Sequence, residues 1–181
     1  HELLGSRVAS PALDDRSGVA VLLRALELLQ DKELNCGLTV LFSAQEETGE
    51  RGAMIAGYHL NPDIVIAVDV SFALTPDASE YKCGEMGQGV MIGIAPTLDK
   101  DISGQMRELA KQKDIPYQTE VMGSATGTND DVLGTVRGGA RAGLLSIPLK
   151  YMHTPIEVID LNDCEQTAKL LAAYVEQVGK E

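Results

Sequence analysis

Hydrophobic positions along the chain follow two periodicities, one typical of helices and one typical of buried strands. Between residues 17 and 30, apolar residues recur at spacings of three and four, which predicts an amphipathic helix with Ser17 as its N-cap. A second amphipathic helix is predicted near the end of the chain, at 161–178. Three further helices are predicted at 52–58, 102–113 and 130–136.

Short apolar runs separate these helices. The runs at 38–43 and 64–68 are continuous, which is typical of strands buried on both faces, and further strands are predicted at 90–94, 117–122 and 144–147. Strands that alternate with helices favour a mostly parallel sheet, because parallel neighbours need a long crossover connection. We therefore expect an α/β fold, a three-layer sandwich whose central sheet is flanked by helices and binds ligands at the carboxyl ends of its strands.

Composition narrows the function classes. The chain has 181 residues, with 27 acidic and 15 basic side chains and a formal charge of −12. That charge repels nucleic-acid backbones and anionic lipid surfaces, so we expect no nucleic-acid or membrane partner and favour cations and amines. No apolar run approaches the length of a membrane span. The length is sufficient for one hydrophobic core, so we expect a single domain.

Cysteine use indicates a reducing compartment. Cys36, Cys83 and Cys164 are odd in number, widely spaced and in no Cys-x-x-Cys pair. This pattern suits neither a disulfide framework nor a thiolate zinc site, and three ordinary core thiols explain it. We expect a cytoplasmic protein.

Two pairs of adjacent carboxylates lie at the ends of predicted elements. Asp14 and Asp15 precede the first helix, where they either favour the positive end of the helix dipole or supply a metal ligand. Glu46 and Glu47 follow an apolar strand, where they form either a solvated acidic turn or a ligand beside a general base. Neighbouring side chains on an extended backbone point in opposite directions, which suits the second alternative.

Asp69 and His153 complete the set of candidate residues. Asp69 ends the strand at 64–68, and His153 lies two residues before a proline; either has an ordinary explanation as a turn or hydrogen-bonding residue. Taken together, the carboxylates and the imidazole form a consistent ligand set for zinc, cobalt or manganese. A pair of such ions lowers the pKa of a bridging water and polarises a carbonyl group, which is the chemistry of amide hydrolysis.

Four motifs carry a resemblance to a known family. They are the run Ala-Leu-Asp-Asp-Arg-x-Gly at 12–18, the pair Glu46-Glu47, Asp69 after a spacing of 22 residues, and Tyr-Met-His-Thr-Pro-Ile-Glu-Val at 151–158. In this combination the chain resembles the glutamyl and tetrahedral aminopeptidases, dinuclear metallopeptidases that are often labelled cellulase or endoglucanase.

The resemblance implies a role for each candidate residue. It implies two divalent ions bridged by Asp14, with a cis peptide bond between Asp14 and Asp15. Glu46 is then the catalytic general base, Glu47 and His153 are ligands of one metal, and Asp69 is a ligand of the other. The substrates implied are peptides, whose N-terminal residues are released.

The chain also departs from that family. Its members are about twice as long and supply one more metal ligand from an N-terminal His-x-Asp motif, which is absent here. The three histidines are followed at the second position by other residues: His1 by Leu3, His59 by Asn61 and His153 by Pro155. The inserted dimerisation domain of the family is absent too, apart from a last strand near 4–10.

We therefore interpret 1–181 as a single partial catalytic domain, with 1–10 as a remnant of the boundary of the inserted domain. The first residue, His1, also suggests a processed chain or a piece of something longer. Homo-oligomers are expected of the full-length protein. The function expected is a metal-dependent aminopeptidase, impaired in this partial chain because one of its two metal sites is incomplete.

Two alternatives stay open. A glycosidase needs two opposed carboxyl groups and no metal, and Glu46 with Asp69 would take those roles. The chain has no Trp, two Phe and five Tyr, which disfavours a sugar-binding cleft. The other alternative is a metal-binding scaffold without catalysis.

Overall fold

The central strand of the sheet, β5 (Arg141–Lys150), is buried on both faces in the computed structural model, which describes residues 1–180. Alternate side chains of β5 enter two separate clusters of buried apolar residues. Leu145, Ile147 and Leu149 lie in the larger cluster, whereas Ala142 and Leu144 lie in the smaller one. Because side chains alternate between the two faces of a strand, both faces of the sheet are covered, as the predicted three-layer sandwich requires.

The sheet contains six strands and is mixed. Its two longest ladders are parallel: β2 (Ile64–Phe72) pairs with β5, and β3 (Val90–Ile94) pairs with β4 (Tyr117–Val121). The shorter ladders are antiparallel, between β3 and β5, between β5 and β6 (Glu157–Asp160), and between β6 and β1 (Arg7–Ser10). The predicted parallel pairing is therefore correct for the two longest ladders, whereas the three shorter ladders are antiparallel. The turn at 151–156 is too short for a crossover, which forces β6 to run antiparallel to β5.

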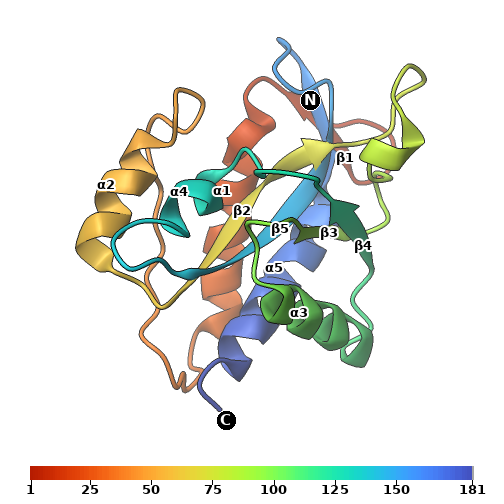
Figure 1. Cartoon of the computed structure of the whole chain (residues 1–181). Helices are drawn as coiled ribbons and strands as arrows, with labels where there is room; N and C mark the ends of the chain where they lie inside the picture. Colours follow the sequence, from red (N-terminus) through yellow and green to blue (C-terminus); the bar gives the residue numbers. More distant parts are fainter. Residues whose placement is uncertain (181) are drawn as a thin grey trace.

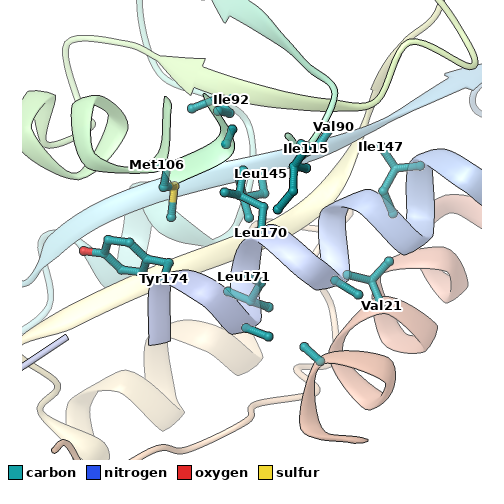
Figure 2. Close-up of a cluster of buried hydrophobic side chains, with 14 of the residues drawn as sticks. Val21, Val90, Ile92, Met106, Ile115, Leu145, Ile147, Leu170, Leu171 and Tyr174 are labelled. Atoms are coloured by element: carbon teal, nitrogen blue, oxygen red, sulfur yellow. The ribbon is translucent and has the colours of Figure 1, made fainter. Parts of the chain in front are cut away.

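Three helices cover the face of the sheet that holds the larger core. They are α1 (Leu13–Leu29), α3 (Lys100–Gln112) and α5 (Leu161–Gln177), and α1 packs along α5. Figure 2 shows this core, in which side chains from all three helices meet those of β3 and β5: Val21, Val90, Ile92, Met106, Ile115, Leu145, Ile147, Leu170, Leu171 and Tyr174. None of the helices in residues 1–180 combines the length and the apolar character that crossing a lipid bilayer needs.

Two shorter helices, α2 (Arg51–Leu60) and α4 (Asn129–Leu133), lie side by side on the other side of the sheet (Figure 1). They approach closely because Gly57 has no side chain: a Cβ atom there would lie 2.5 Å from a methyl group of Leu133. A 3₁₀ turn, η1 (Glu80–Lys82), lies in the connection between β2 and β3.

The helices predicted at 17–30, 52–58, 102–113 and 161–178 are confirmed within a few residues, and the strand at 90–94 is confirmed in full. The strand predicted at 38–43 is wrong. Residues 37–43 form no helix or strand, and their backbone makes no hydrogen bond to the backbone of any other residue in 1–180. An apolar run becomes a strand only where a partner strand is present, and no strand within residues 1–180 pairs with this one.

Candidate metal centre

Three of the candidate residues, Asp14, Glu47 and His153, meet at one end of the molecule although they are far apart in the sequence. One potential ligand atom from each lies within 4.8 Å of the others. His153 Nε2 is 3.1 Å from Asp14 Oδ2 and 3.3 Å from Glu47 Oε2. The Asp14 side chain is largely buried, whereas those of Glu47 and His153 are exposed, so the group opens to solvent on one side.

These distances fit one divalent ion. Oxygen and nitrogen ligands that surround zinc tetrahedrally at about 2.1 Å lie roughly 3.4 Å from one another. The two imidazole–carboxylate distances are close to that separation. Two carboxylate oxygens and one imidazole nitrogen are also a donor set that zinc and cobalt accept.

Asp14 is held by an irregular start of α1. The peptide bond between Asp14 and Asp15 is cis, as the family resemblance implies, and neither residue has helical backbone angles. Asp15 Oδ1 accepts a hydrogen bond from the Gly18 N–H at 2.8 Å, while the Ser17 hydroxyl donates to the Leu13 carbonyl. The prediction that Ser17 is the N-cap is therefore wrong: the carboxylate of Asp15 satisfies the first free N–H instead, because it reaches three residues forward.

Glu46 and Glu47 lie in a tight turn before α2. Gln45 and Glu50 adopt left-handed backbone angles on either side of the pair, and the Gly52 N–H donates to the Ala44 carbonyl. A Cβ atom on Gly52 would lie 2.4 Å from that carbonyl oxygen, so this close approach requires glycine.

The turn separates the two glutamates by environment. Glu46 is half-buried and Glu47 is exposed. Burial raises the pKa of the Glu46 carboxyl, and the nearby carboxylates of Glu47 and Glu50 raise it further. The two side chains therefore differ in burial.

Glu157 supports two members of the cluster and was missed by the sequence reasoning. It is buried at the start of β6, where one carboxylate oxygen accepts from the Asp14 N–H at 3.0 Å and the other accepts from the His153 N–H at 3.1 Å. Its one sequence signal is its position four residues after His153, within the motif at 151–158. That the same carboxylate also reaches Asp14 depends on the tertiary structure.

Asp69 lies outside the group of three. It is located within β2, and its Oδ1 accepts a hydrogen bond from the Val70 N–H at 2.8 Å. Burial raises the pKa of Asp69 to about 7 against the effect of that hydrogen bond, and the nearby carboxylates of Glu46, Asp14 and Glu47 add to the rise. Burial and the carboxylate of Asp69 likewise raise the pKa of Asp15 to about 8.

These shifts identify a site with excess negative charge. Several carboxylates raise one another's pKa values there, and His153 is the one basic side chain beside Asp14 and Glu47. A bound cation would relieve this repulsion by favouring the ionised carboxylates.

Comparison with protein-family models gives a match over most of the chain. The model of the M42 glutamyl aminopeptidase family matches residues 1–170. The lysyl aminopeptidase of Pyrococcus furiosus is 34% identical over 172 residues, which cover 95% of this chain and 49% of that protein. The chain therefore spans about half the length of this curated relative.

Solved structures agree. An aminopeptidase from the archaeon Desulfurococcus kamchatkensis has a TM-score of 0.91 at 32% identity, covering 98% of this chain and 51% of its own. The TET1 peptidase of Pyrococcus horikoshii, which can assemble into a tetrahedron or a large octahedral shell, has a TM-score of 0.81 at 28% identity, covering 97% of this chain and 52% of its own. Some matching structures carry the name endoglucanase, the label that the resemblance led us to expect.

Proposed function

The chain belongs to the M42 glutamyl aminopeptidase family, and from that premise we propose that it is the carboxyl-terminal part of the catalytic domain of a metal-dependent aminopeptidase. The observation that carries the proposal is the convergence of Asp14, Glu47 and His153. Because the chain spans about half the length of its relatives, the activity of a complete protein is part of the proposal.

Asp14, Glu47 and His153 would hold one divalent ion, with zinc or cobalt best suited to the donor set. Asp69, together with Asp14, would hold a second ion. That second site has fewer donors in this chain, since no further His or carboxylate joins Asp69 in a ligand group within residues 1–180. A bound ion would supply a Lewis acid that polarises the scissile carbonyl and acidifies water.

Glu46 is the general base of this proposal. Its carboxyl is half-buried and its pKa is raised by burial and by its acidic neighbours, which brings its proton affinity closer to that needed near neutral pH. The ionised carboxylate would accept a proton from the attacking water and return it to the leaving amine. The surrounding carboxylates would favour the positively charged amino group of a peptide.

Metal binding tests the ligand set directly. We expect calorimetry of the chelator-treated chain with zinc to show one tight site and a second that is much weaker. His153→Ala should weaken the tight site at least tenfold, since it removes one of three ligands. His59→Ala is the matched control, because His59 is also exposed but lies on α2 outside the group of three, and it should leave the affinity unchanged. Two equally tight sites would contradict the assignment.

Turnover tests the catalytic role. We expect the 181 residues alone to hydrolyse aminoacyl nitroanilides weakly or not at all, and a rate similar to that of a complete relative would overturn this.

When the chain is joined to the unmatched half of the Pyrococcus furiosus enzyme, Glu46→Gln should lower kcat by about 10²-fold or more while zinc binding persists. An unchanged rate would remove Glu46 from the mechanism. Hydrolysis of a glycan substrate that survives a chelator would instead favour the metal-free glycosidase.

Assembly is proposed only for a complete protein. The TET1 peptidase forms large closed shells, and the family resemblance assigns oligomer contacts to an inserted domain. We infer that a complete protein forms homo-oligomers and that residues 1–10 lie at the boundary of such an insertion.

A further inference from the structure

The face of the sheet that carries the smaller core changes from apolar to polar toward the carboxyl end of β2. Ala67 and Leu144 belong to that core and are partners in the β2–β5 ladder. The next pair on the same face is Asp69 with Ser146, because side chains alternate between the two faces along each strand. Ser71 follows Asp69 by two residues and shares this face. A polar floor therefore adjoins the smaller core.

Glu120 reaches this floor from β4. It is the partner of Gly93 in the β3–β4 ladder, and β3 lies between β4 and β5. Because Gly93 has no side chain, the side chain of Glu120 can cross β3. Its carboxylate accepts hydrogen bonds from the hydroxyl of Ser146, at 2.8 Å, and from that of Ser71. Both serines are buried and Glu120 is half-buried, so the carboxylate is held over β5 and β2, away from the strand that carries it.

This place adjoins the candidate metal centre. Ser146 faces Asp69 in the β2–β5 ladder, and three carboxylates of the centre raise the pKa of Asp69. Strand β5 also continues from Ser146 into the turn at 151–156, which carries His153. The carboxylate of Glu120 is therefore bound to the direct neighbour of Asp69 at the end of the sheet where the proposed ligands meet.

The bonding of Glu120 is incomplete. A carboxylate has about four acceptor positions, and the two serine hydroxyls fill two of them. None of the ion pairs within residues 1–180 includes Glu120, so its charge has no basic partner there. Hydrogen bonds between two charged groups are stronger than neutral ones, so a cationic ligand with N–H donors would bind here better than a neutral ligand.

We propose that Glu120 lies at the base of a subsite for the side chain of the substrate's N-terminal residue and that it selects a basic side chain. The inference rests on the proposed function, because it requires the scissile carbonyl to lie at the metal centre. Lysine and arginine side chains are long and end in a cation, so they can extend past Asp69 to Glu120. An uncharged side chain of similar length would leave the carboxylate without a charged partner, which is how sites built around a polar substrate group discriminate.

Two ligands that differ by one ammonium group test this on the zinc-loaded chain. Lysine hydroxamate and norleucine hydroxamate share the α-amino group and the zinc-binding group, but only the first has a charged side chain. By calorimetry, we expect lysine hydroxamate to bind at least tenfold more tightly. Glu120→Gln should remove this preference and leave the affinity for norleucine hydroxamate unchanged. Glu108→Gln is the matched control, because it removes the same charge from an exposed position of α3, on the other face of the sheet.

The controls separate this inference from the proposed function. A chain that binds no zinc would overturn the proposed function and this inference with it. Equal affinity of the unchanged zinc-loaded chain for both hydroxamates would overturn the role of Glu120 alone, and this comparison needs no variant to fold. Equal weakening of both ligands by Glu120→Gln would identify their shared α-amino group as its partner, and weaker zinc binding would identify Glu120 as a metal ligand. Either result would also overturn the proposal.

Discussion

Glu157 holds the backbone of two proposed ligands with one buried carboxylate, and its effect can be separated from a general loss of stability. Its oxygens accept from the N–H groups of Asp14 and His153. Asp163 has the same bonding pattern elsewhere: it is buried and accepts from the N–H groups of Gly87 and Gly89. The two carboxylates therefore form a matched pair, one bound to two of the proposed ligands and one outside that group.

We expect Glu157→Gln to lower the free energy of unfolding by about 1–3 kcal/mol, because one buried N–H loses its acceptor. It should also weaken zinc binding by about 10-fold or more, as is usual when a group that orients metal ligands is changed. Asp163→Asn should destabilise the fold similarly but leave zinc affinity unchanged. Urea unfolding and calorimetry on both variants would check this, and equal effects on zinc would refute the positioning role.

At the scale of single elements, a local apolar pattern predicts a helix or strand but not the residue at which it begins. The strand at 90–94 and helix α3 were predicted from their apolar spacing, but the residue that begins α3 was not. Asp99 caps it: its carboxylate accepts from the N–H groups of Asp101 and Ile102 and from Arg141, whose Nε lies 2.6 Å away. Arg141, 42 residues later, binds the same carboxylate, and that contact lies outside any local stretch of sequence.

The cap predicts a pH-dependent stability. The Arg141 side chain, and to a lesser degree the two backbone N–H groups, lower the pKa of Asp99 to about 2 from an ordinary value of 3.8. A carboxylate whose pKa is lowered by folding stabilises the native state above its ordinary pKa and loses that contribution as the pH falls from about 4 towards 2.

We expect Asp99→Ala to cost about 1–2 kcal/mol at pH 7, because helix α3 loses its N-cap. The difference from the unchanged chain should shrink as the pH falls from about 4 towards 2. Asp101→Ala, in the first turn of the same helix, is the control and should cost less, since Asp101 does not cap. Denaturant unfolding at several pH values measures both, and a difference that stays constant with pH would contradict the argument.

At the scale of the whole molecule, stability depends on the sheet layer that both helix layers cover. Leu145 is completely buried in β5, within the larger core, whereas Leu4 is almost completely exposed. We expect Leu145→Ala to lower the free energy of unfolding by about 2–5 kcal/mol, because it leaves a cavity in close-packed surroundings. Leu4→Ala should change it by less than about 0.5 kcal/mol. Similar losses for both variants would show that β5 is not the centre of the fold.

The sequence by itself determined most helices and strands and the α/β class. Local spacing suffices for these, because helix and strand periodicities are properties of short stretches. The family resemblance, carried by four short motifs, added the choice of Asp14, Glu47 and His153 as candidate ligands and the cis peptide bond between Asp14 and Asp15.

Only the tertiary structure decided how these parts combine. It placed Asp14, Glu47 and His153 within 4.8 Å of one another, left Asp69 outside that group, and brought Glu157 under two of its members. It also left 38–43 without a partner, although its apolar pattern is that of a strand. The physical reason is the same in each case: a contact between residues tens of positions apart depends on which elements pack together, and a strand exists only through hydrogen bonds that a second strand supplies.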